Sequence, residues 1–573
     1  MSPRLPLARF IAFGLLVGPL IGCQTPTPSQ EAPAPAAPET SRPQAEAPYR
    51  YALFTYLAAQ LARQGGHPDE AAPWFARTAE VTGRAELYGE AVHAALKADN
   101  GEAAATYAKR WRKAAPDEPK SLLALARARV QQEDAEGAAE AVARLVSAHP
   151  RAEEVLLSTG KRLAEAGGVQ MAMQALRGAG EAHSDNAAAH LAYGHFLTRL
   201  RQQQAAVEAL RRARELRPEW QLAVVQLAQA LPANEGLAVL RDFLAGHPDA
   251  FQPRLRFAQG LLATDRPSEA EQVYTTLAGD HPEEAEVFMG LGLARFHQEK
   301  WVDAAEAFRR VLVLDPGNNA ALYHLGRVAE AQEDYAGAAA HYSRVHSGRY
   351  TQEARLREAM AAVQTEDLER ALQLVRQLRA FQPEEPEYYR LEARIMAEMD
   401  QVKAAEKLAD RGLDKHPQNV DLLYTRALIR DQRGDYQGME ADIRRVIEQR
   451  SDEARAYNFL GYSLADRGVR LDEALELIRK ANDLEPEAGY ILDSLGWVYY
   501  RMGKLDAAER NLRHALKRTP DDPKILAHLG EVLEARDRPG EARQVWQQAL
   551  EKVEVGSQLG RELRRRLGEG QAQ

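Results

Sequence analysis

The sequence is short of cysteine, aromatic residues and positive charge, and each shortage excludes a class of protein. Cys23 is the only cysteine among 573 residues, so the chain can form neither an internal disulfide nor a cysteine-based zinc site. The formal net charge is −9, whereas proteins that bind nucleic acid need clustered Lys and Arg to contact phosphates. Aromatic residues make up only 7% of the chain, while the abundant Ala, Leu, Glu, Arg and Gln favour helices. We therefore expect an all-α protein that has no nucleic-acid partner.

Motifs that carry catalysis are also missing. No HExxH, Walker or nucleophile-elbow pattern occurs in the sequence. Gly290 and Gly292 form a G-x-G, but they lie within a helical pattern, where small residues serve helix contact and do not form a phosphate loop. Histidines such as His149 and His281 precede prolines at helix ends, far apart in sequence, which makes them poor metal ligands. We predict a protein that is not an enzyme, with no catalytic residue, metal, cofactor or small-molecule substrate.

The segment 1–22 has the features of a signal peptide. Arg4 and Arg9 make a basic start, and residues 10–17 form an apolar run too short to span a bilayer. The run ends in "LIGC", which resembles a bacterial lipobox and implies cleavage before Cys23 and lipid attachment to it. The alternative is an incidental cysteine after an ordinary signal. Gln24 stands where an aspartate would commonly signal inner-membrane retention, so the resemblance favours the outer membrane, with the chain facing the periplasm.

Residues 23–48 follow as a lipidated cysteine and a tether. The stretch "QTPTPSQEAPAPAAPETSRPQAEAP" is rich in Pro, Ala and polar residues and cannot bury a core, so we expect it to be disordered. Several acyl chains on one residue anchor a protein stably, and membrane contact would need nothing else.

Beyond the tether, prolines recur with a period of about 34 residues, which is the period of tetratricopeptide repeats. These repeats consist of two antiparallel helices each. The recurring prolines are Pro116, Pro150, Pro218, Pro248, Pro282, Pro316, Pro383, Pro417, Pro486 and Pro520.

Five copies of the repeat pattern are well formed. In one of them, Phe288, Leu291 and Gly292 are followed by Ala304 and Phe308, in the spacing of the family pattern. Small residues at such positions let two helices approach closely, and large residues fill the gaps between them. The phase predicts units that start near residues 51, 85, 119, 153, 187, 221, 251, 285, 319, 353, 386, 420, 454, 489 and 523.

We expect 12 to 15 helical pairs in a right-handed superhelix. Pro232 interrupts the short unit at 221–250 and predicts a kink, which places a boundary between an N-terminal arc of degenerate repeats (49–250) and a C-terminal arc (251–556). Residues 557–573 carry Leu559, Leu563 and Leu567 on one stripe, as a capping helix and tail require.

The last third of the chain resembles one particular family. It is similar to the outer-membrane tetratricopeptide lipoproteins of proteobacteria that bind the carboxyl-terminal processing protease, a periplasmic serine protease. The residues that carry the resemblance are "LLYTRALIRDQRGD" (422–435), "LGYSLADRG" (460–468), "ILDSLGWVYYRMGKLDAAERNLRHAL" (491–516) and "AHLGEVLEARDRPGEARQVW" (527–546).

The resemblance implies an adaptor that holds the protease at the outer membrane, activates it and presents protein substrates such as peptidoglycan cross-link hydrolases. Two alternatives remain open. The chain could be a scaffold for an outer-membrane export or assembly machine, such as an exopolysaccharide exporter or a pilus secretin, or it could bind or cleave peptidoglycan.

Two surfaces are candidates for partner binding. The first helices of the units line the concave groove of such an array, and an aromatic and polar stripe falls on three of them. Its members are Tyr424, Asn458, Tyr462, Tyr490, Asp493, Trp497 and Tyr500. Aromatic side chains flanked by polar groups are typical binding anchors, although Trp497 could instead pack against a neighbouring helix.

The second candidate is the first helix, predicted over residues 49–64. It carries more apolar surface than a terminal helix should expose, notably Tyr51, Phe54, Leu57 and Leu61. This helix could dock the protease, or it could pack on the first unit as a cap.

Overall fold

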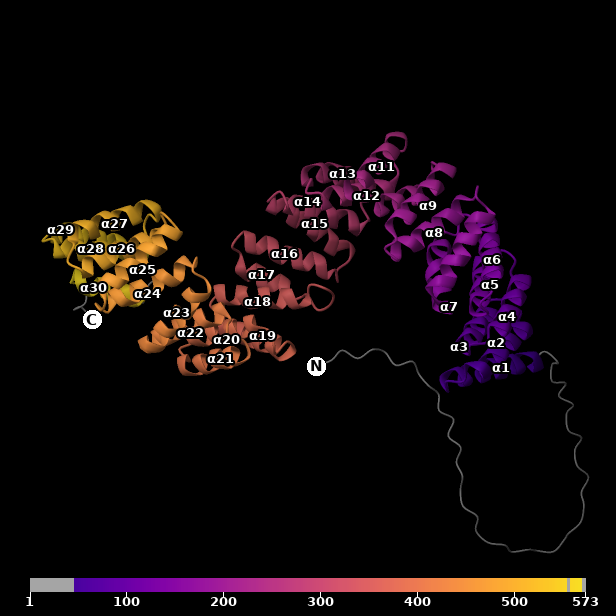
Figure 1. Ribbon diagram of the computed structural model, residues 1–573, viewed down its shortest axis with the longest axis horizontal. Helices are drawn as coiled ribbons and strands as arrows, with labels where there is room; N and C mark the ends of the chain where they lie inside the picture. Colours follow the sequence, from indigo (N-terminus) through magenta and orange to yellow (C-terminus); the bar gives the residue numbers. More distant parts are fainter. Residues whose placement is uncertain (1–45, 554–556, 569–573) are drawn as a thin grey trace, which may run out of the picture. The chain divides into compact units, whose positions relative to one another are not determined.

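The computed structural model describes residues 46–553 and 557–568, and this part of the chain contains 30 helices and no strand (Figure 1). The expected signal peptide, the lipidated Cys23 and the tether up to residue 45 lie outside the described residues. None of the described helices combines the length and the apolar character that crossing a membrane requires. The all-α prediction is confirmed.

The contacts divide the chain into two units between Tyr193 and Gly194. Residues 250 and 251, where the sequence suggests a boundary, therefore lie inside the second unit. The helices of the first unit are α1 (Glu46–Gln64), α2 (Pro68–Thr82), α3 (Leu87–Lys97), α4 (Gly101–Ala114), α5 (Pro119–Gln131), α6 (Ala135–Ala148), α7 (Glu153–Ala182) and the start of α8 (Ala187–Arg199).

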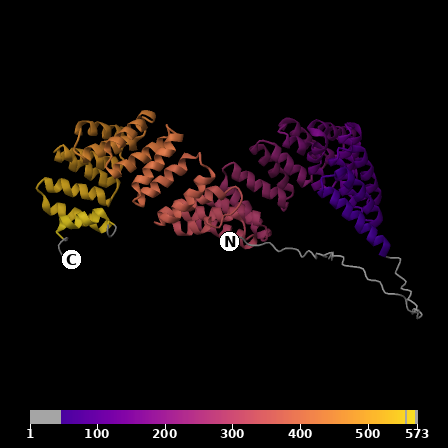
Figure 2. The ribbon, with the colours of Figure 1, turned by 90° about the horizontal axis from the view of Figure 1, so that it is seen from below.

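The second unit continues in the same pattern, and its successive helices lie side by side in both ribbon views (Figures 1 and 2). Its helices are α9 (Gln203–Leu216), α10 (Gln221–Ala230), α11 (Ala233–Gly246), α12 (Phe251–Ala263), α13 (Pro267–Asp280), α14 (Ala285–Phe296), α15 (Trp301–Leu314), α16 (Asn319–Ala331), α17 (Tyr335–Tyr342), α18 (Thr351–Gln364), α19 (Leu368–Phe381), α20 (Pro386–Glu398), α21 (Val402–Lys415), α22 (Val420–Arg433), α23 (Tyr436–Gln449), α24 (Ala454–Asp466), α25 (Leu471–Leu484), α26 (Gly489–Arg501), α27 (Leu505–Arg518), α28 (Pro523–Ala535), α29 (Pro539–Lys552) and α30 (Gln558–Leu567).

The helix starts follow the repeat phase. Twelve of the fifteen predicted unit starts coincide with the first residue of a helix, and the others differ by a few residues, as at 353, where α18 begins at Thr351. Helix α7 fills a whole unit by itself, because Gly167 and Gly168 leave the helical conformation in its middle. Gly168 has φ +85°, which a side chain would oppose, so this glycine allows the break. The expected arrangement of 12 to 15 helical pairs is confirmed.

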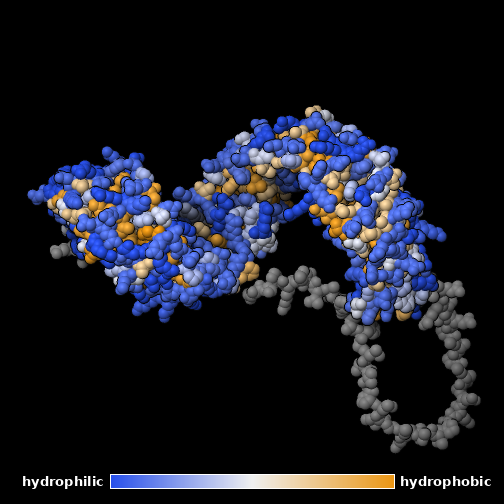
Figure 3. Space-filling view, in the orientation of Figure 1, coloured by the Kyte–Doolittle hydropathy of each residue, from blue (hydrophilic) through white to orange (hydrophobic). Residues whose placement is uncertain are grey.

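Glycines at the contact between paired helices explain how the pairs close. A Cβ built on Gly326 would lie 2.4 Å from the ring of Tyr342, and one on Gly530 would lie 2.1 Å from the indole of Trp546. The large side chain of the second helix therefore needs a glycine opposite it on the first helix. The orange surfaces of Figure 3 are the apolar side chains that emerge between the hydrophilic ones.

The turn inside most pairs contains a residue in the left-handed conformation, although the turn between α10 and α11 has none. In the second unit, Asp265, Glu299 and Glu333 have φ of 56°, 57° and 61°, at the same position of three successive repeats. Such a residue reverses the chain after the first helix, and in this protein it is usually an acidic residue where glycine is the common choice.

The last helix closes the second unit. In α30, Leu563 is buried against the core, and Leu559 and Leu567 pack beside it. Ser557 caps the helix start, with its hydroxyl accepting a hydrogen bond from the Gly560 N–H at 3.1 Å.

Candidate functional site

The seven residues of the predicted stripe lie on three successive first helices. Tyr424 belongs to α22, Asn458 and Tyr462 to α24, and the other four to α26. Their surroundings differ, because some face a cavity or solvent and others are enclosed between helices.

Trp497 is enclosed. Only 8% of its surface is exposed, and its indole stacks on the imidazole of His528 in α28 with the ring centres 4.2 Å apart. Its Nε1 donates a hydrogen bond to Oδ1 of Asp466 in α24 at 3.2 Å. Of the two alternatives for Trp497, packing against a neighbouring helix fits these surroundings, since its ring fills the space between neighbouring first helices.

Asp493 is enclosed as well, with 5% of its surface exposed. Its Oδ1 lies 2.8 Å from Nδ1 of His528, so the carboxylate is paired within the structure. A buried, paired carboxylate of this kind holds neighbouring helices together and is not free to bind a partner. His528 was missed in the sequence, although its place on the first helix of the next repeat could have pointed to it.

Tyr462 lies between these enclosed groups and the surface. The ammonium of Lys524 sits over its ring, 4.3 Å from the centroid. Burial, followed by the charges of Asp466, Asp493 and Asp431, raises the pKa of its hydroxyl. The hydroxyl is therefore neutral at any physiological pH and can only act as a hydrogen-bonding group.

Tyr490 and Tyr500 are the members of the stripe on α26 that reach solvent. The Tyr490 hydroxyl donates to Glu485 at 2.7 Å, and burial together with this carboxylate raises its pKa. The Tyr500 hydroxyl donates to Glu531 at 3.4 Å. Both rings offer an apolar face with a hydroxyl at its edge, as binding tyrosines do.

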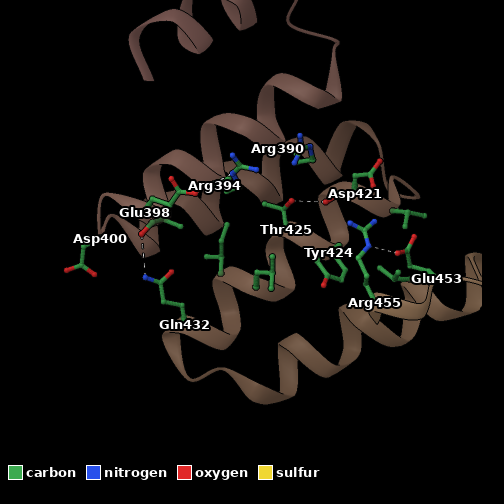
Figure 4. A pocket seen from close by; sticks show the side chains of 15 residues that line it. Arg390, Arg394, Glu398, Asp400, Asp421, Tyr424, Thr425, Gln432, Glu453 and Arg455 are labelled. Carbon is green, nitrogen blue, oxygen red and sulfur yellow. Dashed lines mark hydrogen bonds and ion pairs between the residues drawn. The ribbon is translucent and has the colours of Figure 1, made fainter. Parts of the chain in front are cut away.

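A cavity of about 530 Å³ opens between α20, α22 and the start of α24, and it contains Tyr424 (Figure 4). Its apolar lining comes mainly from α22, where Leu428 remains 41% exposed. Polar groups surround this lining, and Figure 4 shows them on both sides of the cavity. They are Arg390, Arg394, Glu398, Asp400, Asp421, Thr425, Gln432, Glu453 and Arg455.

Much of the charge around the cavity is already paired. Arg390 donates two hydrogen bonds to Glu387, one of them from Nε at 2.6 Å, and Arg455 donates from Nε to Glu453 at 2.9 Å. The apolar floor of the cavity, formed mainly by α22, is therefore the part that remains available to a bound molecule. A space of this size and composition accepts one large apolar side chain of a bound polypeptide.

One buried polar atom of the stripe is unsatisfied. Oδ1 of Asn458 is shielded from solvent and accepts no hydrogen bond within the described part of the chain. Asn458 occupies the same repeat position as Tyr424, one unit later. Buried polar atoms are normally hydrogen-bonded, so this oxygen is an exception within the described part of the chain.

A single repeat position organises this surface. Counted from the unit starts at 420, 454 and 489, Leu428, Tyr462 and Trp497 all occupy the ninth residue. This regularity was available in the sequence, and it would have added Leu428 to the candidate residues.

Helix α1 is both a cap and an exposed apolar surface. Thr55 and Ala59 are fully buried against the repeat array, and Phe54 makes an edge-on contact with Trp74 of α2, with centroids 5.6 Å apart. Tyr51 accepts a hydrogen bond from Arg77 of α2 at 3.2 Å. Tyr51 and Phe54 nevertheless stay 42% and 57% exposed, and Leu57 and Leu61 are 49% and 68% exposed. Tyr49 and Leu53 share the i, i+4 spacing of Leu57 and Leu61 and are exposed as well. We call these four residues the α1 stripe.

No group of three or more metal-ligating side chains occurs among the residues that the structure describes.

Comparison with known proteins identifies the repeats. The tetratricopeptide repeat model matches residues 255–319, 303–350, 424–488 and 494–555, so these segments of the second unit are tetratricopeptide repeats. A TPR repeat-containing protein of Pseudomonas aeruginosa is 42% identical over 214 residues, which are 37% of this chain. The match spans about a third (36%) of that relative's length.

Two solved structures have a similar course of the chain. One is the APC/C hetero-tetramer Cut9-Hcn1, with a TM-score of 0.36, 13% identity, and coverage of 87% of this chain and 98% of that chain. The other is a tetratricopeptide repeat protein from Parabacteroides merdae, with a TM-score of 0.34, 16% identity, and coverage of 50% and 98%.

Proposed function

We propose that this protein is a non-catalytic adaptor that recruits and activates a carboxyl-terminal processing serine protease in the periplasm. It would present protein substrates, such as peptidoglycan cross-link hydrolases, to that protease. Tetratricopeptide arrays act generally as scaffolds for other proteins, which supports the broader class of function. The specific partner rests on the resemblance of residues 422–546 to adaptors of this protease.

The observation that carries the proposal is the surface formed by α20 to α26. It combines an apolar cavity with tyrosines that reach solvent. An extended polypeptide could place an apolar side chain on Leu428, between the polar groups that surround the cavity. Recognition of this kind requires only an apolar side chain and polar groups beside it, so it would suit a protein that presents several different substrates.

The α1 stripe is the surface we assign to the protease. Four large apolar side chains on one helical face remain exposed, although the opposite face of α1 is packed against the array. Exposed apolar surface of this kind usually marks an interaction site. The α1 stripe belongs to the first unit and the cavity to the second, so the two proposed binding surfaces share no residue.

Attachment to the outer membrane through Cys23 forms part of the proposal. Lipidation would concentrate the adaptor at one membrane without any spanning helix. Mass spectrometry of the N-terminal peptide from membrane fractions tests this directly. We expect the chain in the outer-membrane fraction to begin with a diacylglyceryl cysteine. An unmodified cysteine, or a chain found in the inner membrane, would contradict this part of the proposal.

An affinity pull-down from envelope extract tests the function. The immobilised chain should retain a carboxyl-terminal processing protease, and adding it to the purified protease should raise the rate at which a hydrolase substrate is degraded. Recovery of secretin or polysaccharide-export components without the protease would favour an assembly scaffold instead. Cleavage of purified sacculi by the chain alone would contradict the non-catalytic proposal.

A further inference from the structure

The first unit has a different side chain chemistry at the repeat position that builds the cavity region of the second unit. The ninth residues of the units starting near 85, 119 and 153 are His93, Arg127 and Lys161. They lie on α3, α5 and the first half of α7, which are three consecutive first helices. A cation or a histidine thus replaces the Leu, Tyr and Trp found further along the chain.

Arg127 is the central member of this row, and it lacks a partner. Its Nε is shielded from solvent and makes no hydrogen bond within the described part of the chain. The pKa of Arg127 is lowered by burial and next by the positive charge of Arg162 on α7. The carboxylate of Glu165 acts in the opposite direction. Burying half of a guanidinium next to another cation costs folding free energy, and an anion that binds there would offset this cost.

The equivalent arginines of the second unit show what Arg127 is missing. Arg327 has Glu330 one turn later, with Nε 3.9 Å from a carboxylate oxygen, and Arg394 has Glu398, with the same separation 3.4 Å. On α5 the residues one turn after Arg127 are Val130 and Gln131. Gln131 bonds to Asp99 and to the Leu96 carbonyl, so α5 supplies no carboxylate for Arg127.

Other cations surround Arg127. Lys97 at the end of α3 and Arg162 on α7 are exposed and form no ion pair within the described part of the chain. The pKa of His93 is lowered by partial burial and then by the positive charges of Lys97 and Arg127.

The carboxylates on the same side are already engaged. Glu90 lies 3.2 Å from Arg63, and Glu165 lies 3.8 Å from Lys161. The face therefore carries three cations that have no intramolecular anion within the described residues, in a chain whose formal net charge is −9.

We propose that the face formed by Lys97, Arg127 and Arg162 binds an extended acidic peptide segment of a partner protein. The three cations lie on consecutive first helices, which pack about 10 Å apart in such an array. An extended peptide rises about 3.3 Å per residue, and carboxylates at every third position match this spacing. Each would meet one cation, and the guanidinium of Arg127 would gain a charge-assisted hydrogen bond.

A peptide suits this row better than a membrane surface. The central cation is recessed between its neighbours, with its Nε inaccessible to solvent, while the outer two are exposed. A narrow chain with side chains on both sides can reach a recessed group, whereas a flat anionic surface would meet the outer two first. The site lies in the first unit, separate from the cavity region, so it does not depend on the function proposed above.

The test is fluorescence anisotropy of the full chain with two labelled nonapeptides. One peptide has Glu at every third position with Ser between, and the other has Gln in place of Glu. We expect salt-sensitive binding of the Glu peptide only, and about tenfold weaker binding by Arg127→Gln, because one charge-assisted contact is lost. Lys97→Gln and Arg162→Gln should each weaken binding too, and since both side chains are exposed, these variants report on the site even if Arg127→Gln impairs folding.

Arg327→Gln and Arg394→Gln are matched controls, because they remove a cation at the same repeat position in the second unit. Unchanged binding in these two, together with the losses above, supports the site. Equal binding of the Glu and Gln peptides, or wild-type affinity in the first-unit variants, overturns it. Loss of binding to phosphatidylglycerol vesicles in the first-unit variants without any effect on the peptide would also overturn it, because it would identify the face as a membrane contact.

Discussion

The indole of Trp497 and the imidazole of His528 stack with their centres 4.2 Å apart and an angle of 23° between the rings. The same indole donates to Asp466, and the same imidazole is paired with Asp493. Helix α26 is thereby joined to the first helix of the preceding unit and to that of the following unit. In an array where each unit touches only its neighbours, such contacts determine how strongly the units are coupled.

Replacing Trp497 by alanine should therefore destabilise the protein. The change removes a buried ring and leaves a cavity, which typically costs about 3 kcal/mol, and it leaves His528 without its stacking partner. Urea unfolding followed by circular dichroism should show a lower midpoint for the C-terminal repeats. Tyr500→Ala, on the same helix but partly solvent-exposed, should cost less than about 1 kcal/mol. Equal and small effects of both variants would show that Trp497 contributes to a surface and not to packing.

The contrast between Trp497 and the helix starts shows what could be predicted from the sequence. The unit starts and the glycine contacts follow from the repeat period, because they depend on packing inside one helical pair. The burial of Trp497 and Asp493 depends on contacts between the first helices of neighbouring units. Those contacts are set by the twist from one unit to the next, and periodicity does not encode that twist.

The cavity residues illustrate the same limit. The repeat phase could place Tyr424 and Leu428 on one face, but it did not show that Leu428 stays 41% exposed while Trp497, at the same repeat position, is buried. Unpaired cations such as Arg127 were equally hidden, because only the structure shows which carboxylates lie within reach.

Substrate capture should depend on the floor of the cavity. Leu428→Asp places a charge where an apolar side chain would bind, so we expect about tenfold weaker binding of a purified cross-link hydrolase. Leu428 is 41% exposed, so the fold should tolerate the change. Surface plasmon resonance with immobilised hydrolase measures the effect.

Val302→Asp is the matched control for Leu428→Asp. Val302 lies on α15, the second helix of its pair, and is 70% exposed. The Val302→Asp variant therefore adds the same charge at a position that does not line the cavity. Similar losses in both variants would indicate general charge repulsion and would remove the cavity from the binding surface.

Protease recruitment should depend on the α1 stripe. A double change of Leu57 and Leu61 to Asp removes half of the exposed apolar stripe and should reduce protease binding by at least tenfold. Deleting α1 is a less informative experiment, because it would expose Phe75, which the helix covers together with the rest of α2. Point variants keep that cover, so circular dichroism should be unchanged.

Val313→Asp provides the comparison for the α1 variant, since Val313 is 68% exposed on α15. Pull-down of the purified protease by each variant distinguishes the outcomes. Undiminished recruitment by the double variant would show that α1 serves only as a cap.

The contact between Glu440 of α23 and Arg470 at the start of α25 should make stability depend on pH. Both terminal guanidinium nitrogens of Arg470 donate to Glu440, one of them at 2.9 Å, and Arg444 donates to it at 2.8 Å. These contacts, that of Arg470 first, lower the pKa of Glu440 from 4.5 to about 2. Since the folded state prefers the ionised carboxylate, the stabilisation is complete above pH 4.5 and is lost as the pH falls towards 2.

Glu440→Gln should accordingly cost about 2 kcal/mol at pH 6, a value that allows for solvent screening of the two half-exposed arginines. By pH 3 the difference in the free energy of unfolding between Glu440→Gln and the wild type should fall by more than half. At that pH Glu440 is protonated in the unfolded wild type but still largely ionised in the folded state. Urea unfolding of both proteins at the two pH values measures this change. Glu299→Gln is the control, because it removes an exposed carboxylate that has no ion pair in the described part of the chain. A Glu440→Gln penalty that does not vary with pH would mean that the bridge between α23 and α25 acts through its hydrogen bonds and not through its charge.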